Sequence, residues 1–185
     1  MKALMLHAGP RALLHLREHG LQPQHVPIVP AAAGGPKGLV LNPLDRFLFG
    51  HWLPRGGHTV HLLGASIGAW RMATACLPDP DAAFADMASA YIRQDYDHAP
   101  GKPPAAAHVS AVFGAALRER FGGREAAVLR HPRLRLHVFT SRGRRVLGRE
   151  GARGSRLSTP LGYLGAFAVN AVSRRAMGGW IERVV

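Results

Sequence analysis

Cysteine, long apolar runs and C-terminal acidic residues are all scarce in this sequence of 185 residues. The single cysteine, Cys76, rules out an intrachain disulfide, and we expect it to pack as a small apolar residue. No uncharged apolar run reaches the length of about 18 residues that a membrane-spanning helix needs. The apolar stretch at the N-terminus is too short for a signal peptide, so we expect a cytoplasmic protein.

Acidic residues become rare after Asp97, the last aspartate, and the dipeptide Asp-Gly does not occur. Residues 1–100 carry eight Lys/Arg and seven Asp/Glu, whereas residues 101–185 carry sixteen and four, a net charge of +12. The basic segment 142–156 has no aromatic side chain for base stacking, which disfavours nucleic acid as a partner. We expect this segment to be a solvated loop that meets anionic lipid headgroups at the membrane periphery.

Short apolar runs alternate with segments of helical periodicity, a rhythm that is typical of α/β proteins. Strands separated by helices favour a mainly parallel sheet with helices on both of its faces, within one domain spanning 1–185. The expected strands cover 2–8, 26–32, 58–65 and 133–140, and the expected helices cover 10–20, 38–50, 67–77, 81–95 and 105–121.

The pentapeptide 64–68 has the pattern Gly-x-Ser-x-Gly and stands between an expected strand and an expected helix. That context is the one a nucleophile elbow needs, with Ser66 on the tight turn. Gly64 and Gly68 leave room for the turn, and the N-terminus of the following helix faces developing negative charge. The pattern therefore predicts that Ser66 is a nucleophile, the alternative being an ordinary tight turn.

A second glycine-rich loop follows the expected strand at 26–32 and contains Gly34 and Gly35. Consecutive glycines let backbone N–H groups converge on an anion or oxyanion, although an ordinary strand-to-helix turn would look the same. A phosphate-binding P-loop is disfavoured, because Lys37 precedes Gly38 and no Ser or Thr follows. The dinucleotide pattern Gly-x-Gly-x-x-Gly is absent from the chain.

The order of these two motifs, about thirty residues apart, resembles the patatin-like phospholipases. The signature of that family is Gly-Gly-Gly-x-Arg/Lys-Gly, then Gly-x-Ser-x-Gly, then Asp-Gly-Gly or Asp-Gly-Ala. Segment 33–38 matches the first motif with alanine in the leading position, and segment 64–68 matches the second. The resemblance covers residues 24–78 specifically and the remainder only loosely.

The resemblance implies a three-layer α/β/α fold and a Ser–Asp dyad that hydrolyses lipid acyl esters through an acyl-enzyme, without cofactor or metal. It makes Ser66 the nucleophile and assigns the oxyanion hole to Gly34 and Gly35. Lys37 and Gly38 would support the loop and its charge.

The third motif of the family has no counterpart here, because the chain contains no Asp-Gly. We therefore expect an N-terminal portion of the domain that stops before the catalytic aspartate, with a sheet incomplete at the C-terminus. Such a portion should be inactive alone, and we expect the apolar segment 157–181 to expose its large side chains.

A conventional α/β-hydrolase with a Ser-His-Asp triad is the chief alternative mechanism. Its base would be one of three histidines, namely His108, His131 and His137. That fold usually builds more sheet before its elbow than 60 residues allow, so the early position of Ser66 favours the patatin-like interpretation.

Two further alternatives concern binding rather than hydrolysis. His15 and His19 would share a helix face, but Glu18 points elsewhere and no third ligand accompanies them, so we expect no metal site. The chain as a non-catalytic basic module for lipid headgroups or nucleic acid is the remaining possibility. Such a module needs neither a nucleophile elbow nor a glycine-rich loop.

Overall fold

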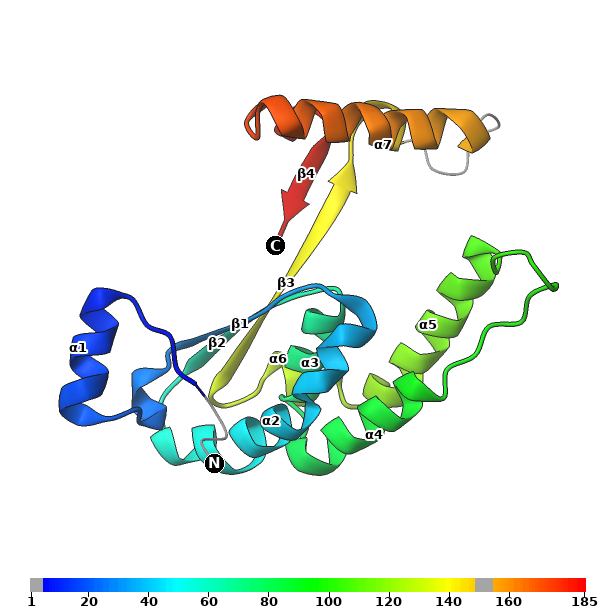
Figure 1. Ribbon diagram of the computed structural model, residues 1–185. Coiled ribbons are helices and arrows are strands. Elements are labelled where there is room, and N and C mark those ends of the chain that lie inside the picture. The colour runs from blue at the N-terminus through cyan, green and yellow to red at the C-terminus, as the bar shows by residue number, and fades with distance from the viewer. Residues whose placement is uncertain (1–4, 149–154) are drawn as a thin grey trace.

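The computed structural model describes residues 5–148 and 155–185, and its centre is a four-stranded sheet (Figure 1). The strands stand in the order β1 (Ile28–Ala31), β2 (Val60–Ala65), β3 (Leu134–Gly143) and β4 (Ile181–Val184). β1, β2 and β3 are parallel to one another, whereas β4 runs antiparallel to β3. The chain thus has an α/β fold with a mostly parallel sheet, as the sequence predicts.

The helices follow the expected order, with one strand missing at the N-terminus. Residues 5–8 are irregular, so the strand expected at 2–8 is wrong there, and residues 1–4 lie outside the described residues. The helix expected at 38–50 is divided into a 3-10 turn, a short α-helix and a π-turn. The α-helices are α1 (Pro10–His19), α2 (Asn42–Phe47), α3 (Ile67–Thr74), α4 (Pro80–Ile92), α5 (Ala106–Phe121), α6 (Glu125–Leu129) and α7 (Ser155–Val172).

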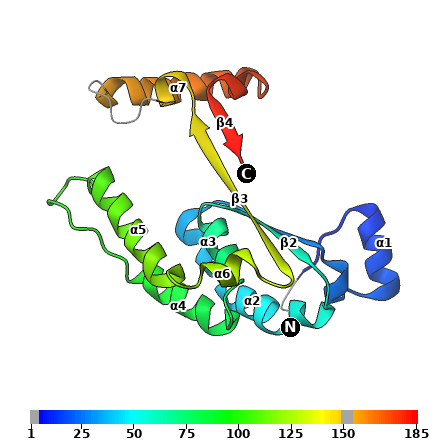
Figure 2. The same ribbon diagram turned by 180° about the vertical axis from the view of Figure 1, so that it is seen from behind.

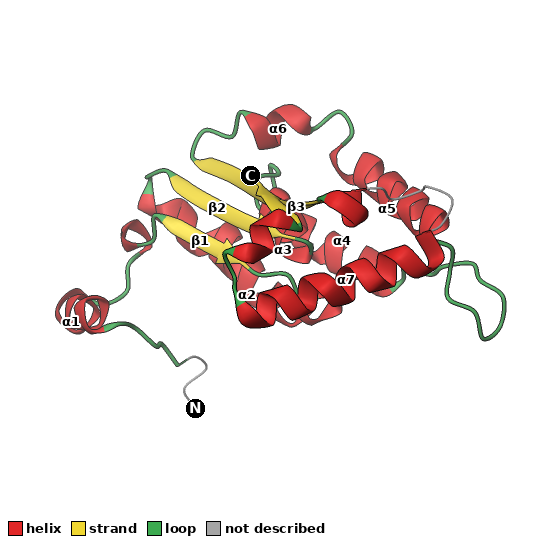
Figure 3. Ribbon diagram, turned by 90° about the horizontal axis from the view of Figure 1, so that it is seen from above, coloured by secondary structure: helices red, strands yellow, loops and turns green. Residues whose placement is uncertain are grey.

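One face of the sheet carries the core. α3 packs across the three parallel strands, and α2 and α4 lie on the same side of the sheet as α3 (Figures 1 and 3). Leu62 of β2, Met72 of α3 and Phe84 of α4 are completely buried where these elements meet. Burial of such side chains contributes about 1.5–3 kcal/mol each, which makes this layer the main source of stability.

The opposite face of the sheet is open among the described residues. Ile28 of β1 and His61 of β2 point to that side, and both are exposed. The expectation of helices on both faces is therefore wrong for this part of the chain. The reason is the path of β3, whose residues 140–143 run past β2, pair with β4 and carry α7 away from the sheet (Figures 1 and 2).

The segment after 157 exposes its large apolar side chains, as predicted. Leu161, Leu164, Phe167 and Val172 of α7 are all mostly exposed. A helix with the length and hydropathy needed to traverse a bilayer is absent from the described residues.

A buried ion pair joins the two helices that follow β1 and β2. The guanidinium of Arg71 in α3 donates hydrogen bonds of 2.6 and 2.7 Å to the two carboxylate oxygens of Asp45 in α2. Both side chains are buried. Such a paired, bidentate geometry satisfies both charges, but either charge alone in that place would be strongly unfavourable.

We expect Asp45→Ala to lower the free energy of unfolding by about 3–5 kcal/mol, because it leaves the Arg71 guanidinium buried without its partner. Urea unfolding followed by circular dichroism measures the loss. Asp81→Ala is the matched control, since Asp81 pairs with Arg46 in the same bidentate way but at the surface. The control should lose far less, and equal losses in the two variants would contradict the assignment.

Candidate active site

Ser66 occupies the turn between β2 and α3 in a strained backbone conformation. Its φ of 54° and ψ of −127° make it the one non-glycine residue with positive φ in the described ranges. L-residues avoid this region, and holding one there costs on the order of 1–3 kcal/mol. The side chain is exposed rather than packed. A strained, exposed serine between a strand and a helix has the geometry of a nucleophile elbow.

The two glycines of the elbow are required by close backbone contacts. A Cβ atom on Gly64 would lie 2.5 Å from the Cα atom of Ala69, and one on Gly68 would lie 2.1 Å from the carbonyl oxygen of Ala31. No side chain fits at such distances. The contact at Gly68 places the first turn of α3 against the end of β1, beside the other glycine-rich loop.

That loop, residues 32–38, leaves β1 at the same edge of the sheet at which Ser66 leaves β2. Ala31 and Gly64 are register partners, so the two turns start side by side. Gly35 has a φ of 54°, and a Cβ atom on Gly38 would lie 3.0 Å from the Cγ2 atom of Ile67, the residue after Ser66.

The structure thus brings together the predicted residues of both motifs. Gly38 packs against Ile67 beside the elbow, and Gly34, Gly35 and Lys37 belong to the same loop, with Lys37 exposed to solvent. The first N–H groups of α3 have no partner within the helix, as at every helix start. These groups and the N–H groups of the glycine-rich loop are backbone donors at the same end of the sheet, and backbone donors of this kind can stabilise an oxyanion.

The three candidate histidines do not complete a triad with Ser66. His131 precedes β3 at the amino end of the sheet, roughly 20 Å of strand away from the elbow. Its Nδ1 accepts hydrogen bonds from the N–H groups of Arg133 and Leu134. Burial and the nearby cations lower the pKa of His131.

The other two histidines are also engaged elsewhere. Nε2 of His137 lies 3.0 Å from Nδ1 of His61 on the open face of the sheet. His108 accepts a hydrogen bond from the N–H of Asp97. The geometry therefore disfavours the conventional triad. The described residues also include no group of three His, Cys, Asp or Glu side chains placed to hold a metal ion.

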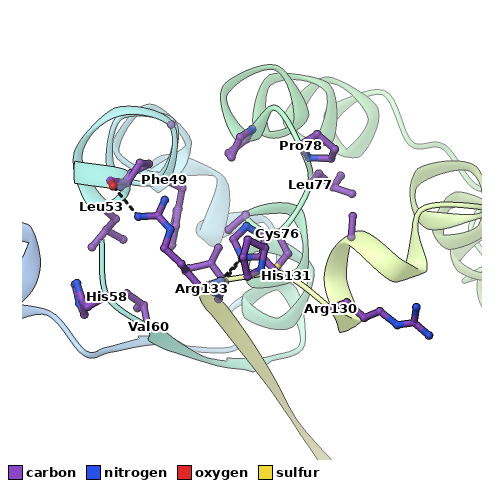
Figure 4. Close-up of a pocket in the computed structure, with 17 residues that line it drawn as sticks. Phe49, Leu53, His58, Val60, Cys76, Leu77, Pro78, Arg130, His131 and Arg133 are labelled. Atoms are coloured by element: carbon purple, nitrogen blue, oxygen red, sulfur yellow. Dashed lines mark hydrogen bonds between the residues drawn. The ribbon is translucent and has the colours of Figure 1, made fainter. Parts of the chain in front are cut away.

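A cavity of about 450 Å³ lies at the opposite end of the sheet from Ser66 (Figure 4). It is lined by Val60 at the start of β2, by Leu53 and Cys76, and by His131 and Arg133 before β3. Burial raises the pKa of the Cys76 thiol to about 12, so the thiol stays protonated and packs as the sequence predicts. This cavity is well formed, but it has no part in chemistry at the elbow.

A second cavity, of about 390 Å³, begins next to the elbow. Ala69 and Trp70 of α3 form one wall, and the others come from α5, α6 and β3. Its lining is almost wholly apolar: Ala69, Trp70, Ala73, Leu117, Phe121, Val128, Leu129 and Val138 line it together with Glu125. Sequence reasoning missed this site, because its walls come from segments far apart in the chain.

Comparison with family models, with curated proteins and with solved structures gives no match for this chain.

We expect Ser66→Gly to be more stable than Ser66→Ala by about 1 kcal/mol. Alanine keeps the Cβ atom and hence the strain of about 1–3 kcal/mol. Glycine removes the strain, but it lowers the stability by roughly 0.4–1 kcal/mol because the unfolded chain gains conformational entropy. Urea unfolding of the two variants measures the difference. An alanine variant more stable than the glycine variant would mean that the backbone at Ser66 is unstrained.

Gly68→Ala should lower the free energy of unfolding by about 1–3 kcal/mol or more, because the added methyl group collides with the Ala31 carbonyl. Gly114→Ala in α5 is the control. There the nearest atom, Nη1 of Arg118, is 3.5 Å from the new methyl group. Alanine in a helix interior should add up to about 1 kcal/mol, and a similar gain for Gly68→Ala would refute the close packing.

Proposed function

We propose that this chain carries the nucleophile and oxyanion hole of a patatin-like serine hydrolase that cleaves acyl esters of lipids. The observation that carries the proposal is the pairing of a strained, exposed Ser66 with a glycine-rich loop on the neighbouring strand. The motif order that resembles the family supports the same conclusion from the sequence. The apolar cavity beside Ala69 supports a substrate with a long acyl chain.

The proposed reaction begins when the Ser66 Oγ attacks the ester carbonyl carbon and gives up its proton to a base. Backbone N–H groups of Gly34 and Gly35 stabilise the oxyanion of the tetrahedral intermediate. The intermediate collapses, the alcohol leaves with the proton from the base, and an acyl group stays on Oγ. Water, activated by the same base, then hydrolyses the acyl-enzyme.

The scheme needs a general base, and none is hydrogen-bonded to Ser66 among the described residues. In the family that the chain resembles, the base is an aspartate of the Asp-Gly motif, which this sequence lacks. Within the described residues, neither a carboxylate nor an imidazole is hydrogen-bonded to Ser66. A general base contributes about 10²–10⁴-fold to the rate, so the chain alone should turn over esters slowly.

Because deacylation needs the base as well, p-nitrophenyl butyrate should leave a butyryl group on Ser66 that accumulates during long incubation. Mass spectrometry of tryptic peptides measures the adduct, and Ser66→Ala should abolish it. Added imidazole or formate should speed release of the acyl group in the wild-type chain only. Ser110→Ala, at an exposed serine of α5, is the matched control and should leave the adduct at Ser66 unchanged.

Two outcomes would decide against the proposal. Adduct on Ser66 no greater than that on Ser110 would favour the non-catalytic basic module. Fast Ser66-dependent turnover without added base would point to a base inside this chain, and so to the conventional triad.

A further inference from the structure

α7 presents an apolar side to solvent at one end of the molecule. Leu161, Leu164, Phe167 and Val172, which we call the α7 apolar face, are 64%, 64%, 70% and 89% exposed. Positions three or four residues apart lie on one side of a helix, as Leu161, Leu164 and Phe167 do, and Val172 falls about one turn further on, close to the angular position of Leu161. Four large apolar side chains on one helix form a continuous surface that a water-exposed helix does not normally carry.

The opposite side of α7 is the one that packs against the rest of the chain. Gly162 and Ala166 are buried there. A Cβ atom on Gly165 would lie 3.0 Å from the Cη2 atom of Trp180, which precedes β4. α7 therefore packs through its small residues on the turns at 145–148 and 176–179 and on Trp180, and its large residues are exposed to solvent. Figures 1 and 2 show the helix standing apart from the layer formed by α2 to α6.

Positive charge surrounds the same end of the molecule. Arg174 and Arg175 follow α7 after Ser173, and Arg142 of β3 and Arg183 of β4 lie opposite Glu182 and Ser141 in the antiparallel pair that these strands form; all four arginines are exposed. The half of the chain that contains them has a net charge of +12. A second copy of the chain would bring the same charge to this surface and be repelled. An anionic membrane offers an apolar interior and negative headgroups together.

We propose that the α7 apolar face enters the boundary between headgroups and acyl chains of an anionic membrane, with Arg174 and Arg175 on the lipid phosphates. This inference deepens the proposed function. It rests on that function in one respect, namely that the membrane supplies the lipid acyl ester that is hydrolysed. The expectation of a solvated loop at 142–156 is wrong for its described residues, because 142–143 belong to β3, 145–148 form a 3-10 turn and 155–156 begin α7; residues 149–154 lie outside the described residues. The docking element proposed here is the later part of α7 and the arginines that follow it. The helix lies in the plane of the membrane and does not span it.

Sedimentation with vesicles of phosphatidylcholine, with and without phosphatidylglycerol, tests the apolar contribution. Leu164→Ser combined with Phe167→Ser should weaken binding to the anionic vesicles about tenfold or more. Leu14→Ser is the control, since Leu14 of α1 is 60% exposed but lies outside α7. The control should bind as the wild type does, and equal binding by all three proteins would overturn the proposal.

The electrostatic contribution has its own matched pair of variants. Arg174→Gln with Arg175→Gln should weaken binding to anionic vesicles by about tenfold and leave the weak binding to pure phosphatidylcholine unchanged. Arg93→Gln with Arg118→Gln removes the same charge from α4 and α5. Equal losses for both pairs would mean attraction by net charge alone and would overturn a docking role for α7.

A labelling experiment reports insertion directly. Phe167→Cys, carrying an environment-sensitive dye, should shift its emission to the blue on anionic vesicles, while Leu14→Cys should not. Cys76 does not compete for the dye, since it is buried with a pKa of about 12. A dye on residue 167 that already reports an apolar environment without vesicles, with a dimer in sedimentation equilibrium, would assign the face to self-association instead.

Ser66→Ala should bind vesicles as tightly as the wild-type chain. Loss of the Ser66 adduct without loss of vesicle binding therefore tests hydrolysis alone. Normal acylation of Ser66 by a chain that fails to bind vesicles would overturn only the docking proposal.

Discussion

The contact between Gly68 and the Ala31 carbonyl is the constraint on which the arrangement of the site depends. The first turn of α3 lies so close to the end of β1 that a single methyl group at Gly68 has no room. This approach sets α3 across the strands and starts both glycine-rich turns at neighbouring register positions. The unusual backbone at Ser66 is the counterpart of the same contact, because the chain must reverse sharply between β2 and a helix held that near.

The Asp45–Arg71 ion pair secures the same arrangement from the helical side. Asp45 lies on the helix that follows the glycine-rich loop, and Arg71 lies on the helix that follows the elbow. The pair therefore ties together two strand–turn–helix units whose strands are already hydrogen-bonded. Fixing both ends of each unit is what lets the fold hold a strained residue at Ser66, since the cost of one such residue is small beside the burial of Leu62 and Met72.

Local pattern predicted those elements whose partners are near in sequence or whose periodicity is strong. The strand at 133–140 alternates clearly and forms β3, and the apolar run before the elbow forms β2. The apolar residues at 2–8 looked equally strand-like, but residues 5–8 pair with nothing. Which face a helix covers, and that Asp45 would meet Arg71 across 26 residues of chain, depend on tertiary packing that no local pattern carries. The two glycine-rich motifs were predictable because each is a tight turn formed by consecutive residues, with glycine at the positions where a side chain does not fit.

The topology of the sheet also bears on why the proposed nucleophile, Ser66, has no base hydrogen-bonded to it among the described residues. In a parallel sheet, residues that meet at a site follow the carboxyl ends of neighbouring strands. β1 contributes the glycine-rich loop there, and β2 contributes Ser66. β3 is the neighbour that would bring a third loop to the same edge. Instead it continues as a strand beyond its last pairing with β2, at Phe139, and pairs with β4. Among the described residues, β3 therefore continues as a strand past this end of the sheet, with Phe139 opposite Ala65, and its histidines are hydrogen-bonded on the strand or before it rather than to Ser66.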